Sequence, residues 1–235
     1  MSLRYILFDL DGSLLPMDQD AFIESYFGHI SAFVSARGFD AKALAKAIWQ
    51  GTAAMFQNDG KHTNEEVFWS VMTQLLGDTA VQSQPTLEEF YRSQFHLVRN
   101  ACGFDPLAAA TIQSLKEQGY TLALATNPIF PAIATESRMA WAGLNRSDFA
   151  LYTTYENSRY SKPNPRYYQE VLEKLGAKPE ECLMVGNDAT EDAAAEQLGI
   201  PVFLLTDCLI NKQQKPISQY PQGNLTDLLQ YIRSL

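Results

Sequence analysis

A chain of 235 residues can hold one large domain, or a domain with a second one inserted, and 46% hydrophobic residues is an ordinary globular composition. The formal net charge of -9 argues against nucleic acid as the main partner, because binding its backbone depends on clustered Lys and Arg. Cys102, Cys182 and Cys208 fit no metal-ligand pattern and indicate buried, reduced thiols in a cytoplasmic protein. Met1 leads into the first apolar run without a basic-then-apolar leader, and no apolar stretch approaches ~18 residues, so neither secretion nor membrane insertion is expected.

The first predicted strand, residues 5–8, leads into two carboxylates, Asp9 and Asp11, followed by Gly12. In an open α/β sheet, ligands bind at the carboxyl ends of the strands. Two carboxylates ~4 Å apart repel each other by roughly 4 kcal/mol at an effective dielectric of 20. The turn therefore favours a bound cation, and the alternative is a solvated Asp-Gly turn.

The next block of the chain has helical periodicity. Apolar residues recur at spacings of three and four, and no convincing strand interrupts them. The pattern predicts helices from Phe22 to Val34, from Asp40 through Trp49, from Thr63 to Leu75, and from Thr86 to Val98, the last two opening with Thr-x-x-Glu capping boxes. We interpret residues 16–100 as an inserted helical cap domain and residues 1–15 with 101–235 as the core domain.

From Asp105 onward, predicted strands and helices alternate. Strands are expected at residues 121–125, 149–155, 182–185 and 201–205, with helices capped by Asp105, Asn164 and Asn224 between and after them. Residues 207–223 are polar and are expected to form a loop. Strict alternation with short connections predicts an α/β fold with a doubly wound (Rossmann-like) parallel sheet.

Polar side chains follow several of these strands, and in a parallel sheet they meet at one edge. They are Asp9 and Asp11, then Thr126 and Asn127, then Lys162, and finally Asp188 with Asp192. This set suits a metal ion and an oxyanion such as phosphate, and Mg²⁺ is the best match for carboxylate oxygens with retained water.

Each of these residues also has a purely structural interpretation. Lys162 alone is compatible with a solvated loop lysine, Thr126 with a cap on the next helix, and Asp192 with a first-turn acid that favours the helix dipole. Nothing marks His62 or His96 as a ligand. The aromatic side chains of the helical block are expected to form its own core: Phe22, Tyr26, Phe68 and Trp69.

The order and spacing of these segments resemble the haloacid dehalogenase-like hydrolase superfamily over nearly the whole chain. Residues 9–14 (DLDGSL) are similar to its first motif, residues 125–127 (ATN) to its second, residues 161–163 (SKP) to its third, and residues 186–188 (GND) with Asp192 to its fourth. The helical insertion resembles the family's helical cap. Ser13 replaces the commoner threonine, and Asn187-Asp188 stands where Gly-Asp is frequent.

The resemblance implies a role for each matched residue. Asp9 would attack phosphorus and carry an aspartyl-phosphate intermediate, and Asp11 would protonate the leaving alcohol and later activate water. Asp9, the Asp11 backbone carbonyl and Asp188 would hold Mg²⁺. Thr126, Lys162 and the backbone near Gly12 and Asn127 would bind the phosphoryl oxygens, and Asp192 would support the site from behind.

These roles predict a Mg²⁺-dependent phosphohydrolase acting on a small phosphorylated metabolite. A dehalogenase is disfavoured because carbon–halogen displacement needs no leaving-group acid such as Asp11. A sugar phosphomutase with the same core residues is one alternative. A catalytically idle module that binds a phospho-ligand or a partner protein is another.

Overall fold

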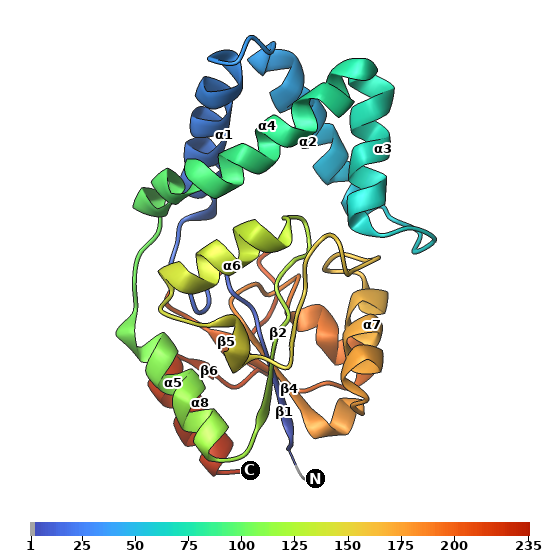
Figure 1. Ribbon diagram of the computed structural model, residues 1–235. Helices are drawn as coiled ribbons and strands as arrows, with labels where there is room; N and C mark the ends of the chain where they lie inside the picture. Colours follow the sequence, from blue (N-terminus) through green and yellow to red (C-terminus); the bar gives the residue numbers. More distant parts are fainter. Residues whose placement is uncertain (1–2) are drawn as a thin grey trace.

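The computed structural model describes residues 3–235 as a parallel sheet flanked by helices, with a further layer of helices above one end of the sheet (Figure 1). In this part of the chain the sheet has the strand order β3-β2-β1-β4-β5-β6. The strands are β1 (Tyr5–Phe8), β2 (Thr121–Leu124), β3 (Leu151–Tyr152), β4 (Cys182–Gly186), β5 (Val202–Leu205) and β6 (Gln222–Gly223). The predicted doubly wound α/β fold is confirmed.

Strand β1 lies in the middle of the sheet. Its last residue, Phe8, pairs with Leu124 of β2 and with Val185 of β4, and both pairings are parallel. The order of connections reverses between β1 and β4, and such a reversal leaves a crevice outside the carboxyl ends of the strands. The segments that follow β1, β2 and β4 therefore open on the same crevice.

Alternating side chains of the strands pack on opposite faces of the sheet. One face, which includes Phe8 and Leu124, packs against the helices α5 (Pro106–Glu117), α6 (Ala132–Trp141) and α8 (Leu225–Arg233). The other face, which includes Leu7 and Met184, packs against α7 (Pro165–Leu175) and the 3-10 helix η4 (Ala193–Leu198). The sheet is thus buried on both sides.

Local capping explains where the core helices begin. Asp105, Asn164 and Asn224 each accept hydrogen bonds from backbone amides in the first turn of α5, α7 and α8, as the sequence predicts. Gly176 has a left-handed conformation and ends α7. Short 3-10 helices η2 (Arg146–Asp148) and η3 (Pro179–Glu181) complete the connections.

The layer above the sheet consists of four α-helices and a 3-10 helix, which we call the cap helices after the predicted cap domain. They are α1 (Gln19–Ser35), α2 (Ala41–Phe56), α3 (Asn64–Leu76), α4 (Asp78–Ser93) and η1 (Phe95–Ala101). The capping box of Thr63 and Glu66 is present at the start of α3. The expected helix start at Thr86 is wrong, because α4 begins at Asp78, directly after Gly77, and continues through Pro85. Its expected C-terminal part, to Val98, is the separate helix η1.

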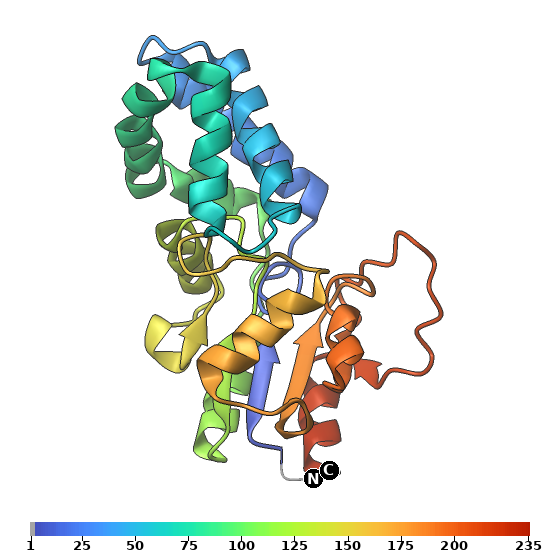
Figure 2. The same ribbon diagram turned by 90° about the vertical axis from the view of Figure 1, so that its right-hand side faces the viewer.

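Two expectations for the second half of the chain need correction. The predicted strand over residues 149–155 is shortened to β3, which pairs with β2 through two residues only. The predicted loop contains β6, which pairs with β5, and Ile210, which forms a bridge with Asp188. In Figure 2 the rest of this segment projects beside the sheet. A strand as short as β6 shows little periodicity in the sequence, so the polar composition of the segment predicted a loop.

Two linkers connect the cap helices to the sheet, and they run beside each other. The Gly103 amide donates to the Pro16 carbonyl at 2.7 Å, and Met17 forms an antiparallel bridge with Cys102. The first linker begins directly after the turn that holds Asp11 and Gly12. The route into the cap and the route out of it therefore form a two-stranded connection next to the predicted site.

A second contact joins the start of α3 to loops of the core. The buried Asn64 side chain donates to the Pro128 carbonyl at 3.0 Å and to Ser161 Oγ at 3.2 Å, and it accepts from Asn58 Nδ2 at 2.9 Å. The Asn64 amide donates to the Ser158 carbonyl at 2.8 Å. Asn64 thus bridges the cap and the loops that follow β2 and β3.

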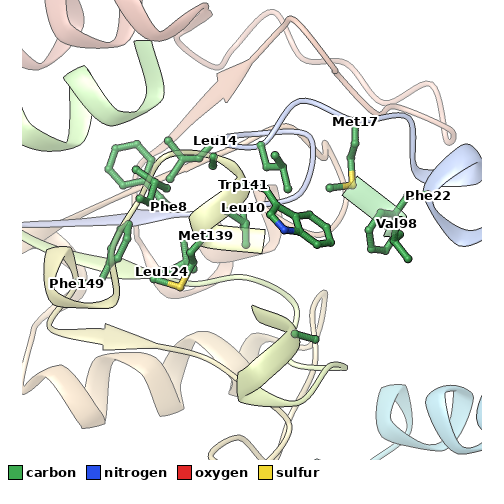
Figure 3. Packing of buried hydrophobic residues seen from close by; sticks show 14 of the residues in the cluster. Phe8, Leu10, Leu14, Met17, Phe22, Val98, Leu124, Met139, Trp141 and Phe149 are labelled. Carbon is green, nitrogen blue, oxygen red and sulfur yellow. The ribbon is translucent and has the colours of Figure 1, made fainter. Parts of the chain in front are cut away.

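One hydrophobic cluster extends from the sheet into the cap helices. Figure 3 shows it running from Phe8 through Leu14 and Met17 to Phe22 of α1 and Val98 of η1. Because apolar burial is the main favourable term in folding, this continuity stabilises the placement of the cap on the core. Within residues 3–235, no helix combines the length and the apolar composition that crossing a membrane requires.

The cysteines differ from expectation in their burial. Cys182 is buried, as predicted, whereas Cys102 and Cys208 are partly exposed. All three are free thiols.

Candidate active site

Asp9 follows β1 directly and lies at the centre of the predicted site. Its amide donates to the Val185 carbonyl at 2.9 Å, which extends the β1–β4 pairing, and the residue is buried. Its Oδ1 lies 2.9 Å from Lys162 Nζ, and its Oδ2 accepts from Ser13 Oγ at 3.1 Å. Both oxygens of Asp9 are therefore held in place by neighbouring side chains.

Asp192 is the second carboxylate that contacts Lys162. Its Oδ1 lies 2.6 Å from Lys162 Nζ, and its Oδ2 accepts from the Asp188 amide at 2.9 Å. Both Lys162 and Asp192 are about 1% exposed. A Cβ on Gly186 would lie 2.1 Å from Asp192 Oδ2, so the glycine of this motif makes room for the carboxylate.

Asp11 pairs with a residue that sequence reasoning missed. Arg138 of α6 is fully buried and forms an ion pair with Asp11 Oδ2. Its guanidinium also contacts Thr135 Oγ1 and lies 4.5 Å from the centre of the Phe130 ring. The other carboxylate oxygen, Asp11 Oδ1, is buried and has no hydrogen-bond partner. In the sequence, the only sign of this pairing is an arginine within a helical pattern. The sequence does not show which side chain that arginine contacts.

Gly12 and Asn187 pack closely at the turn after β1. Gly12 has a φ of 81°, and a Cβ at this position would lie 2.3 Å from Asn187 Nδ2. Asn187 accepts from Ser13 Oγ at 3.0 Å and donates to the Cys208 carbonyl at 2.7 Å. Asn187 thus braces the turn, and its side chain is committed to these contacts.

Thr126 and Asn127 follow β2 on the same edge. The Thr126 carbonyl accepts from Thr153 Oγ1 at 2.6 Å and from the Tyr167 hydroxyl at 2.9 Å, which fixes the backbone. Asn127 Nδ2 donates to Glu191 at 2.9 Å, while its Oδ1 is buried without a hydrogen-bond partner. Glu191 is a second residue that the motif analysis did not identify.

Asp188 lies beyond β4 and uses one carboxylate oxygen locally. Oδ1 accepts from the amides of Thr190 and Glu191 at 2.6 and 2.8 Å, which leaves Oδ2 for another ligand. Asp188 lines the same cavity as Asp9 and Asp11. The structure therefore brings these three carboxylates, Thr126, Asn127 and Asp192 to one cavity, with Lys162 behind Asp9.

Burial and like charge shift several pKa values here. Burial raises the pKa of Asp9 to about 7, with Asp192 and Asp11 adding to the effect and Lys162 opposing it. Burial raises the pKa of Glu191 to about 8. For Lys162 the nearby carboxylates outweigh burial and raise the pKa well above its usual value, so the ammonium stays charged. The site thus holds more carboxylate than its own cations balance.

The donor atoms fit a hard cation such as Mg²⁺. Within residues 3–235, no three His, Cys, Asp or Glu side chains are grouped closely enough to hold a metal by themselves. Mg²⁺ is commonly bound through one or two carboxylates and keeps several waters. This coordination is compatible with three groups of the site: the free Oδ2 of Asp188, the Asp9 carboxylate and the Asp11 carbonyl. In addition, Asp11 Oδ1 has no hydrogen-bond partner, so the turn has an acceptor atom that is not in use.

A cavity of about 440 Å³ lies between this carboxylate cluster and the cap helices. Phe22, Tyr26, Phe68 and Trp69 line it, together with Trp49. The first four were expected only to fill the core of the cap. Their periodicity indicates a buried helix face but does not show that this face borders a cavity.

A model of the haloacid dehalogenase-like hydrolase family matches residues 3–199 of the chain. The chain belongs to the haloacid dehalogenase-like hydrolase family. The resemblance to this family is thereby confirmed, and the protein is a hydrolase.

Individual relatives of this family member cover most of its length. The Rhythmically expressed gene 2 protein of Drosophila melanogaster is 29% identical, and the match covers 83% of this chain and 80% of that protein. A phosphoglycolate phosphatase of Vibrio vulnificus is 24% identical, with 87% and 84% covered. The crystal structure of a 2-haloacid dehalogenase from Pseudomonas syringae has a TM-score of 0.65 at 20% identity, with 99% of each chain covered, and shows the same fold.

The predicted enzyme class is confirmed at the level of a hydrolase of this family.

Proposed function

We propose that the protein is a Mg²⁺-dependent phosphatase of a small phosphorylated metabolite and that it works through an aspartyl-phosphate on Asp9. The observation that carries the proposal is the contact between Lys162 Nζ and Asp9 Oδ1 at 2.9 Å, because Asp9 lines a cavity large enough for a small ester and Lys162 lies behind it. A buried ammonium beside the nucleophile stabilises the negative charge that develops on the phosphoryl oxygens.

The reaction runs in two steps on this chain's own residues. Asp9 attacks phosphorus, a bond forms between its carboxylate oxygen and phosphorus, and the ester P–O bond breaks as Asp11 gives its proton to the leaving alcohol. Asp11 then takes a proton from water as the water oxygen bonds to phosphorus, and the bond between phosphorus and the Asp9 oxygen breaks, which releases phosphate and restores the Asp9 carboxylate. Arg138 holds Asp11 in place throughout.

Other residues orient the phosphoryl group. Thr126, Lys162 and backbone amides near Gly12 and Asn127 would hold its oxygens, and Asp192 fixes Lys162. Asp9, the Asp11 carbonyl and Asp188 would hold Mg²⁺. When bound, the ion would offset the charge of the carboxylates and of the phosphoryl oxygens. Residues 16–100 act as a cap domain that excludes water and contacts the leaving group. In this proposal the enzyme acts in the cytoplasm.

The test is Mg²⁺-dependent phosphate release from an aryl phosphate. The wild-type protein should be active, chelation should abolish activity, and Asp9→Asn should be inactive, whereas Asp20→Asn, whose side chain is 85% exposed, should behave as wild type. With a leaving group that needs no proton, Asp11→Asn should still be phosphorylated but should turn over slowly, which intact-mass measurement can detect.

The same assays separate the alternatives. A sugar phosphomutase would transfer the phosphoryl group to a hexose phosphate and release little phosphate. If the wild-type protein and Asp9→Asn are equally inert across a broad metabolite panel, the protein is a binding module.

A further inference from the structure

The two ends of the cavity differ strongly in polarity. Its floor carries carboxylates from the core, whereas its cap side is built from aromatic and aliphatic side chains. Among the residues that the structure describes, no Lys, Arg or His lines it. Lys162 and Arg138 lie behind Asp9 and Asp11 and are occupied by them.

The polar groups on the cap side are few, and most are already paired. They are Gln19, Tyr26, Thr52, Trp69 and Tyr91. The hydroxyls of Tyr26 and Tyr91 bond to each other at 2.8 Å, and Thr52 donates to the Ile48 carbonyl at 2.9 Å. Trp69 Nε1 has no hydrogen-bond partner, although the Tyr155 hydroxyl lies nearby. A bound leaving group would thus find few free polar partners.

Large apolar side chains of the cap are exposed at this cavity. Trp49 is 56% exposed, Phe56 41% and Ile23 38%, and all three line it. The Trp49 ring also packs against Phe27, with centroids 5.8 Å apart. Removing such surface from water is favourable in proportion to the area covered, so an apolar ligand gains affinity here.

An anionic leaving group, in contrast, is expected to bind poorly in this cavity. A carboxylate or second phosphate on the substrate would lie in the apolar part of the cavity without a cation, near a floor that is already rich in carboxylates. Burying an unpaired charge is costly, and leaving several sugar hydroxyls without partners is costly as well. The cavity therefore discriminates against anionic and polyhydroxylated leaving groups.

We infer that the physiological substrate is the phosphate monoester of an uncharged, largely apolar alcohol, with an aromatic or branched aliphatic group that packs between α1 and α2. This inference rests on the proposed phosphatase function and specifies its substrate class. It separates this chain from its phosphoglycolate phosphatase relative, whose name indicates a substrate with a carboxylate on the leaving group.

The test compares esters of alkyl alcohols, so that intrinsic leaving-group reactivity is similar. With Mg²⁺ present, kcat/KM for benzyl phosphate should exceed that for phosphoglycolate and for a hexose phosphate by about tenfold or more, the scale expected for burying one apolar ring. Equal or greater kcat/KM for phosphoglycolate would overturn the inference while leaving the phosphatase function intact.

Binding supplies a readout that does not depend on turnover. Calorimetry on Asp9→Asn with Mg²⁺ should show tighter binding of phenylethylphosphonate than of phosphonopropionate, the non-hydrolysable counterparts of benzyl phosphate and phosphoglycolate. If no ester is hydrolysed but this preference holds, the phosphatase proposal fails and the ligand class stands. If phosphonopropionate binds as tightly, the ligand class is wrong.

Substitutions in the cap helices test which residues determine the substrate preference. Trp49→Ala should lower kcat/KM for benzyl phosphate by about tenfold. Thr52→Lys, which places a cation in the cavity, should raise the relative kcat/KM for phosphoglycolate. Leu75→Ala is the matched control, because Leu75 is an exposed apolar residue of the cap (47%) that does not line the cavity. An unchanged substrate ratio in Trp49→Ala and Thr52→Lys would contradict the inference.

Discussion

Lys162 Nζ lies 2.6 Å from Asp192 Oδ1, closer than its 2.9 Å distance from Asp9, so Asp192 fixes the ammonium that faces the nucleophile. Asp192→Asn removes one of the two buried carboxylates that pair with Lys162. We expect a loss of stability of about 3 kcal/mol, since removing one partner of a buried ion pair is strongly destabilising. We also expect kcat to fall at least ~10-fold, because a preorganised donor loses its orientation. Urea unfolding and steady-state kinetics measure both effects, with the exposed Asp20→Asn as control.

Arg138 is expected to act as a positioning residue for Asp11. Arg138→Met removes the ion pair and should lower both kcat and stability, the latter by about 2 kcal/mol. Arg138→Lys should restore part of the activity, because it keeps the charge but loses the planar guanidinium. A double-mutant cycle with Asp11→Asn decides whether the two residues act together: fully additive changes in stability would show that they do not.

Asn64 is expected to hold the cap against the core. Asn64→Ala leaves the Pro128 carbonyl, Ser161 and Asn58 each without one buried partner. We expect a loss of about 2–3 kcal/mol, because an unpaired buried polar group costs roughly 1–3 kcal/mol. Thermal unfolding measures the loss, and hydrogen exchange should increase in the loops after β2 and β3. Gln74→Ala, on the exposed side of the same helix, should leave both readouts unchanged.

Gly60 lies where the α2–α3 loop meets the core. Its φ is 87°, and a Cβ would lie 2.0 Å from the Tyr160 hydroxyl oxygen. Gly38 has a similar φ of 84° but has nothing within 4 Å of the same position. Both Gly→Ala changes introduce backbone strain of order 1 kcal/mol, and only Gly60→Ala adds a clash. Gly60→Ala should therefore lower Tm more than Gly38→Ala does; equal shifts would show that the loop relaxes freely.

Glu65, in the first turn of α3, links stability to pH. Burial is the largest cause of its raised pKa, and the nearby carboxylates of Glu156, Glu66 and Glu88 raise the pKa further. A carboxyl whose pKa is higher in the folded state binds more protons there than in the unfolded state. Its stabilising contribution is complete below the unfolded pKa, near 4.5, and is lost as pH rises through the folded value.

Glu65→Gln should therefore flatten the decline in unfolding free energy with pH above about 4.5, where the unfolded side chain ionises. Urea unfolding at a series of pH values measures the slope. Glu24→Gln, an exposed change on α1, serves as the control. A slope that is the same in wild type and Glu65→Gln would exclude the coupling.

Much of the candidate site could be predicted because parallel strands bring their carboxyl ends together. Asp9, Thr126 and Asp188 are far apart in sequence, yet each follows a buried strand, and buried strands are readable as short apolar runs. The helix caps at Asp105, Asn164 and Asn224 were equally predictable, because capping is local chemistry. The roles of these site residues stay predictions.

What the sequence did not disclose depends on packing between distant elements. Arg138 lies on a helix whose rotation relative to Asp11 no local pattern determines. Phe22, Tyr26 and Phe68 are core residues, as predicted, but they also line the cavity, which periodicity cannot show because it indicates only which face of a helix is buried. The start of α4 was predicted wrongly because Gly77 and Pro85 are ordinarily turn signals. In this structure α4 begins directly after Gly77 and continues through Pro85.

The paired linkers carry a mechanical consequence. The Gly103 amide bonds to the Pro16 carbonyl, and Asp11 forms a bridge with Leu15, so we expect a rotation of the cap helices to displace the segment that begins at Asp11. An alcohol that binds against α1 and α2 would therefore affect the position of Asp11 through residues 12–18, which join Asp11 to α1, and this would couple recognition of the leaving group to the placement of the proton that it receives.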